Sequence, residues 1–467
     1  MILQGIHKKP VLFLVCSISA LGGLLFGFDM AVISGVLPFL QKQFNLTAVQ
    51  EGWFVSSALV GCIAGVAMSG ELSDRFGRKK LLVFSAVLFL IAAIGCTWFT
   101  PFSWVVAARI LAGVGVGIAS NIVPLYISEI APAKIRGRLV TYYQLAVTLG
   151  ILVAYLSNAG VLEYSLTAEI DPGNAIFHYL FVEEVWRGMF SIGILPALLF
   201  IVGLFFIPES PRWLIQKGRH AEGLKLLSDL IGAEESKKDA TNIENNKISG
   251  DGSYKELFSP RLRRALLLGL LLPLFSQFSG INAIIYYGPS ILNSAGISLS
   301  NSFQSQVIFG LANMLFTLIA VWKVDALGRR PLYLIGTAGA TISLFVTGLC
   351  FYTGATSSIF LLIAVLAFLA SFAFSIGPLK FVVVSEIFPA KIRGRAMALS
   401  IMVMWIADTI VGQLTPVFLK ELGTASTFWI FSVFCLIAFV TVYILLPETK
   451  GKSLEDIQKY WATTTTK

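Results

Sequence analysis

The segment Ser128-Glu-Ile-Ala-Pro-Ala-Lys-Ile-Arg-Gly-Arg138 recurs almost unchanged as Ser385-Glu-Ile-Phe-Pro-Ala-Lys-Ile-Arg-Gly-Arg395. Two shorter motifs also occur twice and in matching order, Asp74-Arg-Phe-Gly-Arg-Lys79 as Asp325-Ala-Leu-Gly-Arg-Arg330 and Pro208-Glu-Ser210 as Pro447-Glu-Thr449. Each copy follows a long apolar stretch. The repeat therefore predicts a chain built from two related halves.

The composition places these halves in a membrane. Of the 467 residues, 56% are hydrophobic and only 13% are charged. A soluble protein carries about twice that charged fraction. The net charge of +9 does not indicate nucleic-acid binding, because the basic residues lie in short loops between apolar stretches. Basic loops of this kind mark the cytoplasmic side of a membrane protein.

Twelve stretches reach the length of about 20 apolar residues that a membrane-spanning helix needs. They are residues 11–40, 52–72, 81–100, 102–125, 140–162, 188–207, 265–292, 305–324, 332–352, 359–384, 396–418 and 428–446. Four of them, 81–100, 188–207, 332–352 and 428–446, contain no charged residue and are expected to face lipid. The predicted fold class is an all-α membrane protein with 12 transmembrane helices.

The long loop 208–264 divides these spans six and six. We predict an N-terminal six-helix bundle (1–207), a cytoplasmic loop with short helices and a linker (208–264), a C-terminal six-helix bundle (265–446) and a cytoplasmic tail (447–467). The alternation of basic and sparsely basic loops places both termini in the cytoplasm. Duplicated six-span halves with a site between them are typical of secondary transporters.

Several classes of function are not expected. The five cysteines lie within or at the ends of apolar stretches and are predicted to be free thiols. No histidine lies in a span, so we expect no metal site. The spans contain no nucleophile with a neighbouring base, and no loop resembles an ATP site. We therefore expect neither an enzyme nor a bound cofactor.

The segment Gln277-Phe-Ser-Gly-Ile-Asn-Ala-Ile-Ile-Tyr-Tyr-Gly-Pro289 is apolar but carries two amides and two tyrosines. Breaks such as Gly280 and Pro289 are tolerated in a membrane beside protein or a water-filled cavity. Amides and tyrosine hydroxyls donate and accept hydrogen bonds without charge, which suits a hydroxyl-rich ligand. The alternative is hydrogen bonding between packed helices.

The motifs resemble one known family. Gly70-Glu-Leu-Ser-Asp-Arg-Phe-Gly-Arg-Lys79, Arg109-Ile-Leu-Ala-Gly-Val-Gly-Val-Gly117, Pro208-Glu-Ser-Pro-Arg-Trp-Leu214, Pro447-Glu-Thr-Lys-Gly451 and the segment 277–289 are similar to signatures of the sugar-porter family of the major facilitator superfamily, whose bacterial members include proton-coupled sugar symporters. The resemblance covers the whole chain. It implies the major facilitator fold with two pseudo-symmetric halves and transport by alternating access.

Asp29 and Arg109 are the first site residues that the resemblance implies. Intramembrane ionisable residues are functional candidates. At helical rise, Asp29 lies roughly 15 Å and Arg109 roughly 10 Å from the outer end of its span, which is compatible with an ion pair. In the family an acid at this place accompanies proton coupling, so Asp29 is the candidate proton carrier and Arg109 its counter-charge. The alternative is a permanent structural ion pair.

The resemblance also implies residues that contact the sugar. The predicted substrate-binding set is Phe26, Gln144, Ser276, Gln277, Asn282, Asn313, Phe381 and Asp408. Tyr286 and Tyr287 are the predicted outer gate. For Asn313, interhelical hydrogen bonding is an equal alternative.

A third implied set lies at the cytoplasmic ends of the spans, where acids stand near arginines. We expect Asp74 to pair with Arg75 and Arg78, Glu129 with Arg136, Glu209 with Arg212, and Glu386 with Arg393. The predicted cytoplasmic gate consists of these residues together with Asp325, Arg329 and Glu448. The alternative is anchoring of the topology by solvated charges.

Five residues depart from the family pattern: Ser276, Lys380, Phe381, Met404 and Asp408. If Lys380 and Asp408 pair, a neutral sugar or polyol is expected. If Lys380 faces the cavity alone, a sugar acid is possible, and a free Asp408 would offer a second protonation site. Lys380 also has the alternative of extending to the membrane surface.

The sequence thus predicts a multi-pass, monomeric protein of the cell membrane that imports a monosaccharide (pentose or hexose) or polyol, with the proton as coupling ion. The expected partners are the sugar and the lipid bilayer, without nucleic acid. The alternatives are an uncoupled sugar facilitator, an importer of a sugar acid and a transporter-like nutrient sensor.

Overall fold

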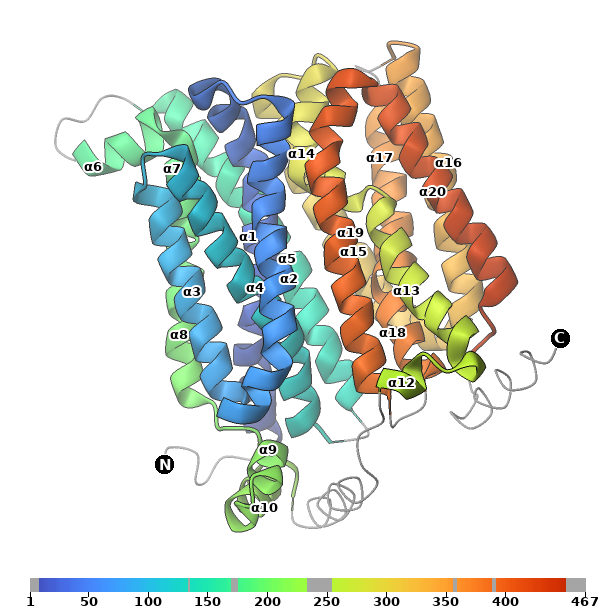
Figure 1. Cartoon of the computed structure of the whole chain (residues 1–467). Coiled ribbons are helices and arrows are strands. Elements are labelled where there is room, and N and C mark those ends of the chain that lie inside the picture. Colours follow the sequence, from blue (N-terminus) through green and yellow to red (C-terminus); the bar gives the residue numbers. More distant parts are fainter. Residues whose placement is uncertain are drawn as a thin grey trace. The chain divides into compact units, whose positions relative to one another are not determined.

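The computed structural model describes residues 8–132, 135–168, 175–232, 254–355, 359–388 and 392–450. Within these residues the chain is helical and has no β-strand (Figure 1). Twelve helices in the described part are long and apolar enough to cross a membrane. The prediction of a twelve-span helical membrane protein is therefore confirmed.

The first six spans occupy the chain up to Phe206. They are α1 (Lys8–Phe44), α2 (Ala48–Phe76), α3 (Arg78–Trp98), α4 (Phe102–Ile130), α5 (Arg136–Thr167) and the pair α7 (Val185–Ile192) and α8 (Ile194–Phe206). Before α7 stand α6 (Ala175–His178) and a π-helical turn, η1 (Tyr179–Glu183). The segment after α8, expected to be helical, forms α9 (Pro211–Gln216) and α10 (His220–Ile231). Residues 233–253 of the predicted loop 208–264, where the linker was expected, lie outside the described residues.

The second six spans follow two short helices, α12 (Tyr254–Leu257) and η2 (Pro260–Leu262). They are α13 (Arg263–Phe278) with α14 (Ile281–Ser294), α15 (Leu299–Leu327), α16 (Arg329–Tyr352), α17 (Ile359–Ser371) with η3 (Phe372–Ile376) and α18 (Gly377–Ile387), α19 (Arg393–Glu421) and α20 (Thr424–Leu445). Most helices extend a few residues beyond the predicted spans. The apolar composition identifies only the part of a helix that lies in the hydrocarbon core of the membrane. The helix itself continues into the flanking polar sequence, because its backbone hydrogen bonds do not depend on apolar side chains.

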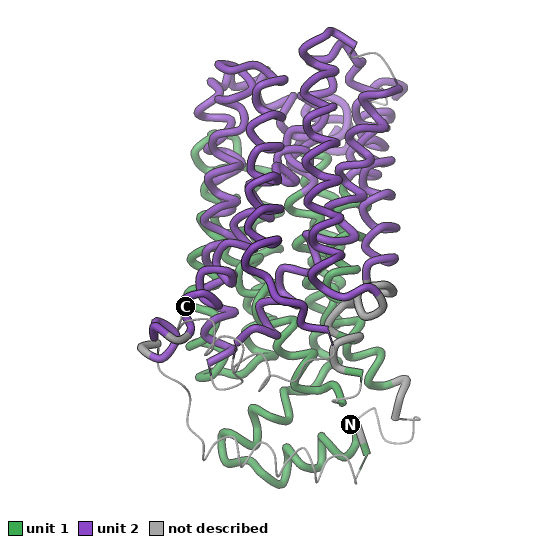
Figure 2. The backbone as a smooth tube through the Cα atoms, turned by 90° about the vertical axis from the view of Figure 1, so that its right-hand side faces the viewer, with its two compact units in different colours: residues 1–30, 60–154, 187–250 green, residues 31–59, 155–186, 251–467 purple. Residues whose placement is uncertain are grey.

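The chain forms two compact units, coloured separately in Figure 2. Unit 1 comprises residues 1–30, 60–154 and 187–250, and unit 2 comprises residues 31–59, 155–186 and 251–467. The border between the units falls inside α1, α2 and α5. The sites below each lie within one unit. The division into domains at residues 207, 264 and 446 stays a prediction.

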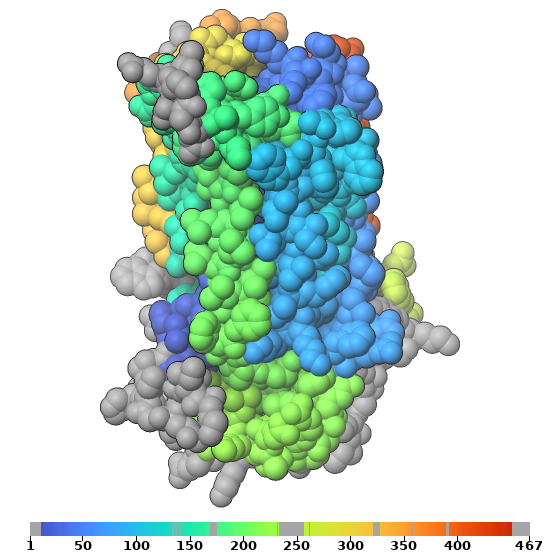
Figure 3. Space-filling model, turned by 90° about the vertical axis from the view of Figure 1, so that its left-hand side faces the viewer, coloured from blue at the N-terminus to red at the C-terminus, as the bar shows by residue number. Residues whose placement is uncertain are grey.

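The uncharged spans of unit 1, α3 and α8, lie at the molecular surface in Figure 3. Large apolar side chains of both helices are exposed, among them Ile91, Leu195 and Phe205. Such a surface is stable only against lipid. This agrees with the expectation that the uncharged spans face the bilayer.

Glycines allow the backbones of α2 and α4 in unit 1 to pack in direct contact. A Cβ on Gly61 would lie 2.2 Å from the Ile110 carbonyl oxygen, and a Cβ on Gly117 would lie 2.3 Å from that of Cys62. Small residues permit this close packing of membrane helices. The contact between α2 and α4 fixes the part of α4 that carries Arg109.

The seventh span is broken at the predicted glycine. Gly280 separates α13 from α14 with a φ of +81°, a left-handed conformation that glycine adopts without a Cβ clash. Pro289 does not break α14, although a proline was predicted to mark a break here. Pro289 has no N–H for the Ile285 carbonyl, and the Tyr155 hydroxyl donates to that carbonyl instead, at 3.3 Å. Membrane helices tolerate proline when a neighbour pairs the freed carbonyl.

Two further prolines of unit 2 are compensated in the same way. Pro273 frees the carbonyl of Gly269, which accepts a hydrogen bond from the Ser400 hydroxyl at 2.8 Å. Pro416 frees the carbonyl of Gly412, which accepts from the Tyr287 hydroxyl at 2.6 Å. Each hydroxyl comes from another helix, so these bonds also hold the helices in register.

Candidate functional site

The first site lies in unit 1, where α1 and α4 bring Asp29 and Arg109 together. Arg109 Nη1 donates to Asp29 Oδ1 at 2.6 Å. The arginine side chain is 2% exposed and the carboxylate 15%. The structure thus forms the pair that the two sequence depths suggested.

This pair is held by a single hydrogen bond. The second carboxylate oxygen of Asp29 and Nε of Arg109 are buried without a hydrogen-bond partner in the described part of the chain. The Phe190 ring lies 5.9 Å from the guanidinium carbon of Arg109, within the range of a cation–π contact. One carboxylate oxygen is therefore available for a proton while the other binds the arginine.

The second site lies in unit 2, where a chain of side-chain hydrogen bonds is centred on Asp408. Asn282 donates through its amide nitrogen to Gln277 Oε1 at 2.8 Å and to Asp408 Oδ1 at 2.7 Å. The Tyr286 hydroxyl donates to the other oxygen, Asp408 Oδ2, at 3.1 Å. The break at Gly280 makes this possible, because α14 restarts just before Asn282. The predicted ligands and one predicted gate residue thus form one cluster.

Lys380 lies next to this cluster but does not pair with Asp408. Its ammonium donates to the Ser276 hydroxyl at 2.8 Å, and it lies 5.2 Å from the centre of the Phe381 ring. Among the described residues no ion pair joins Lys380 to a carboxylate. The side chain is 8% exposed. The hypotheses of a Lys380–Asp408 pair and of extension to the surface are therefore wrong for this structure.

The predicted gate residue Tyr287 contacts a different part of α19. Its hydroxyl donates to the Gly412 carbonyl, and its ring lies edge-on to Tyr286 at 6.4 Å between centres. One residue further along α19, Gln413 accepts from the Ser56 hydroxyl at 2.7 Å and donates to the Val49 carbonyl at 3.0 Å. The segments 31–59, α14 and α19 are thereby tied together within unit 2.

The other predicted sugar contacts are more scattered. Phe26 on α1 and Gln144 on α5 belong to unit 1. In unit 2, Asn313 on α15 is buried, as is Met404 on α19. The part of Phe26, Gln144 and Asn313 in binding stays a prediction.

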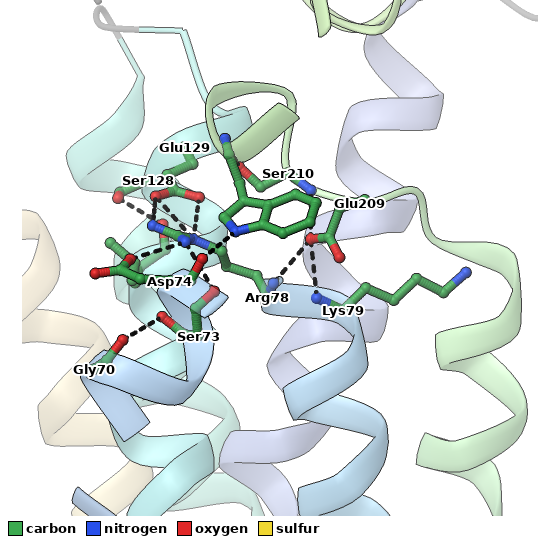
Figure 4. A network of polar contacts seen from close by, with 11 residues as sticks. Gly70, Ser73, Asp74, Arg78, Lys79, Ser128, Glu129, Glu209 and Ser210 are labelled. Atoms are coloured by element: carbon green, nitrogen blue, oxygen red, sulfur yellow. Dashed lines mark hydrogen bonds and ion pairs between the residues drawn. The ribbon is translucent and has the colours of Figure 1, made fainter. Parts of the chain in front are cut away.

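Four of the predicted cytoplasmic-gate residues of unit 1 form the network drawn in Figure 4, here called the first ionic network (Asp74, Arg78, Glu129 and Glu209). Arg78 makes a forked contact with Glu129, with Nε–Oε2 at 3.0 Å and Nη2–Oε1 at 2.9 Å. Arg78 also donates to Asp74 at 3.1 Å. Glu209 accepts from the backbone N–H groups of Arg78 and Lys79 at the start of α3. A carboxylate is favoured at a helix N-terminus.

Unit 2 repeats this arrangement as the second ionic network (Arg329, Glu386, Glu448 and Thr449). Arg329 Nη2 donates to Glu386 at 2.9 Å. Glu448 accepts from the backbone N–H groups of Arg329 and Arg330 at the start of α16. The Thr449 hydroxyl donates to Glu386 at 2.6 Å. The duplicated motifs therefore correspond to duplicated contacts.

The partners within these networks agree with the expected ones in part. The pair of Asp74 and Arg78 is as predicted. Glu386 binds Arg329 from α16 and has no hydrogen bond to Arg393 among the described residues, so that pairing is corrected.

Glu129 binds Arg78, and the side chain of its expected partner Arg136 lies outside the described residues, as does that of Asp325. Arg75 packs on the Phe76 ring. Glu209 caps α3, and its expected pairing with Arg212 stays a prediction.

Two side chains that make hydrogen bonds at these sites, Thr449 and Gln413, were not among the predicted site residues. Thr449 was noted only as part of a repeated motif, although a hydroxyl after a repeated glutamate signals a hydrogen-bond partner. Gln413 was not singled out at all. It is one of few amides within a span, and that rarity was the available signal.

Known proteins resemble this chain in sequence and in architecture. The family model described as "Sugar (and other) transporter" matches residues 15–461. The chain is 41% identical over 456 residues to the arabinose-proton symporter of Bacillus subtilis, covering 97% of this chain and 96% of that one. It is 38% identical to the galactose-proton symporter of Escherichia coli, covering 98% and 96%. The partially occluded inward-open structure of the xylose transporter XylE from E. coli matches with a TM-score of 0.81 at 34% identity, covering 95% and 100%.

The twelve spans and the duplicated networks thus define a membrane transporter of the major facilitator fold, with two pseudo-symmetric six-helix halves. More narrowly, the chain belongs to the sugar transporter family, whose model matches nearly its whole length.

Proposed function

We propose that this protein imports a monosaccharide or a polyol together with protons, across the cell membrane and with both termini in the cytoplasm. The observation that supports coupling is the contrast between two buried ion pairs. Arg78 and Glu129 share a fork of hydrogen bonds, whereas Arg109 and Asp29 share one. A singly bonded carboxylate can exchange its arginine for a proton at lower cost than a forked one.

The coupling step we propose follows from this geometry. Asp29 accepts a proton on its second oxygen when water reaches the site, which neutralises the carboxylate and weakens its bond to Arg109. The helices α1 and α4 are then free to separate, and return of the proton to water on the other side restores the pair. The names of the curated relatives, which are proton symporters of arabinose and galactose, favour this proposal.

The proposed sugar site in unit 2 is the Asp408 cluster. Asn282 and Gln277 offer amide donors and acceptors, and Asp408 accepts two hydrogen bonds. A sugar hydroxyl can replace either donor of Asp408, because a hydroxyl both donates and accepts. Lys380 is bound to Ser276, which favours a neutral sugar over a sugar acid as substrate.

Uptake by cells or proteoliposomes tests the proposal. Labelled L-arabinose, D-galactose and D-xylose are offered with a proton gradient, with and without a protonophore. We expect accumulation that the protonophore abolishes, whereas an uncoupled facilitator would equilibrate the sugar in both cases. A panel of pentoses, hexoses, inositol and uronic acids as competitors then identifies the substrate class.

The variant Asp29→Asn sharpens this test. It should lose uphill accumulation but keep exchange of labelled for unlabelled sugar, because the asparagine cannot carry a proton. Glu163→Gln, which removes an exposed carboxylate at the end of α5, is the matched control and should accumulate normally. Accumulation by Asp29→Asn against a gradient would refute the role of Asp29.

A further inference from the structure

A polar cavity lies in unit 2, at the end of α19 opposite the second ionic network. Its volume is about 330 Å³. The lining comes from the ends of α1, α2, α14, α19 and α20, and includes Glu51, Tyr287, Ser290, Ser294, Lys420 and Thr424. Neither the sugar site nor the ion pair proposed above uses this cavity, apart from the gate residue Tyr287.

Glu51 is the unusual residue in this lining. It is 6% exposed, yet its carboxylate has no hydrogen bond or ion pair in the described part of the chain. The carboxylate of Glu51 lies in the wall of the cavity, where it meets what the cavity holds. Because a carboxylate accepts hydrogen bonds, Glu51 is placed to bind a donor group of a ligand there.

The other lining groups restrict what that partner can be. Lys420 places an ammonium on the same cavity, and the serines and Thr424 add hydroxyls. A divalent cation is a poor fit, because calcium takes six or more oxygen ligands and magnesium is bound through carboxylates, whereas this lining has one carboxylate and a competing ammonium. A hydroxylated neutral ligand fits both charges, since a hydroxyl donates to the carboxylate and accepts from the ammonium.

The size and the apolar part of the lining agree with this chemistry. Small-molecule sites have volumes of about 300–1,000 Å³, with a few polar groups set in apolar walls. Ile291, Pro416 and Leu419 supply such walls, and the aromatic ring of Tyr287 offers a surface on which the apolar face of a sugar can pack.

We propose that this cavity is a second sugar-binding site, in which Glu51 and Lys420 hold the transported class of ligand beside Tyr287. The proposal rests on the proposed function for the identity of the ligand. Sugar bound here lies directly against the gate residue, and so occupies the entrance before it reaches the Asp408 cluster.

Thiol protection tests this proposal with the full-length protein. All five native cysteines are buried, so a cysteine introduced by Ser290→Cys is the accessible target. A membrane-impermeant maleimide labels it, and L-arabinose, D-galactose or D-xylose is added as protectant. We expect sugar to slow labelling, and the same slowing in a Gln277→Ala background, where binding at the Asp408 cluster is weakened.

Glu51→Gln in the Ser290→Cys background is the decisive variant. It should raise the half-protecting sugar concentration by about tenfold, the loss expected for a hydrogen bond to a charged group. Ser294→Cys provides a second reporter if Ser290→Cys fails to fold. Protection that disappears with Gln277→Ala but survives Glu51→Gln would overturn the proposal, because it would report a conformational change caused by the Asp408 cluster.

Two outcomes separate this proposal from the proposed function. Sugar accumulation without any protection of Ser290→Cys refutes the second site alone. Protection by sugar without uptake refutes the transport proposal and leaves the second site standing. Protection of Ser290→Cys by glycine betaine but not by sugars would refute the second sugar site, because it would show that the cavity binds zwitterions.

Discussion

The Asn282 amide donates to the Asp408 carboxylate at 2.7 Å, joining positions 126 residues apart. Asp408 is 1% exposed, so a charge that the sequence left in doubt is held at the centre of a polar cluster. Asn282 and Tyr286 together occupy both of its oxygens. The carboxylate thereby fixes the orientation of an amide whose oxygen and nitrogen would otherwise be free to exchange places.

The first prediction concerns this orientation. Asp408→Ala should raise the KM for sugar about tenfold, because a lost hydrogen bond to a charged group costs about 1.5–3 kcal/mol. Asp408→Asn keeps one acceptor oxygen and should raise KM less. Initial rates of uptake over a range of sugar concentrations measure both. Equal effects of the two variants would contradict the orienting role.

The second prediction concerns Lys380. Ser276→Ala should lower thermal stability by about 1–3 kcal/mol, because the buried ammonium loses its hydrogen-bond partner. The double variant Ser276→Ala with Lys380→Met removes both polar groups and should recover most of this loss. Thermal unfolding in detergent completes the double-mutant cycle. Additive losses would show that the two side chains do not depend on each other.

The third prediction concerns the break in the seventh span. Gly280→Ala combines a left-handed φ with a Cβ placed 2.4 Å from the Phe431 ring. Gly296→Ala is the matched control, since its φ of +84° is similar but no atom lies within 4 Å of the added Cβ. The conformation alone costs about 1–2 kcal/mol. Gly280→Ala should therefore lower Tm clearly more than Gly296→Ala, and equal shifts would count against a steric role of Phe431.

The fourth prediction compares the two ionic networks. The side chains of Arg78 and Glu129 are 5% and 7% exposed, whereas those of Arg329 and Glu386 are 13% and 25% exposed. Removing one partner of a buried pair costs about 3–5 kcal/mol, because the other charge stays buried. Glu129→Gln should therefore lower Tm more than Glu386→Gln. The reverse order in thermal unfolding would show that burial does not decide the cost.

The fifth prediction concerns acid stability at Glu448. Burial raises the pKa of the Glu448 carboxyl. Hydrogen bonds from the backbone N–H groups of Lys450, Arg329, Arg330 and Thr449 together lower this pKa by more than burial raises it. The pKa of Glu448 therefore lies below the usual 4.5. A lowered folded-state pKa contributes stability above the unfolded pKa, and this stability is lost as the pH falls through the folded value.

The variant Glu448→Gln measures this contribution. The wild type should have the higher Tm at pH 6, and the difference from Glu448→Gln should shrink as the pH falls below about 4.5, where the unfolded chain begins to bind the proton. A difference that stays constant between pH 6 and pH 3.5 would show that the Glu448 charge does not stabilise the fold.

Much of the fold was predictable because it depends on properties that each segment carries by itself. An apolar stretch of sufficient length must span the membrane, and it must be helical there because its backbone groups have no other partners. The repeated motifs identified the duplication, and Gly280 marked the break, since glycine is the residue for a left-handed turn.

The partners of charged side chains were less predictable. Glu386 was assigned to Arg393, which is near in sequence, but binds Arg329 from another helix. A pair of Lys380 with Asp408 was one of the alternatives that the sequence left open, but Lys380 binds a neutral hydroxyl. Which charged groups pair depends on how the helices are rotated and packed against one another. A sequence motif shows only which charged groups lie on the same helix, not which groups of other helices they contact. The depths of Asp29 and Arg109 in the membrane were sufficient to predict their ion pair, because few other charged residues lie in those two spans.

Pro416 gives the hydrogen bond of Tyr287, the predicted outer-gate residue, a particular relation to water. The Gly412 carbonyl that accepts from the Tyr287 hydroxyl lies four residues before this proline, which has no N–H to offer it. When Tyr287 moves away, the backbone cannot repair the loss, and a solvent molecule is the available substitute. Any movement of the Tyr287 hydroxyl away from α19 is therefore coupled to hydration of the Gly412 carbonyl.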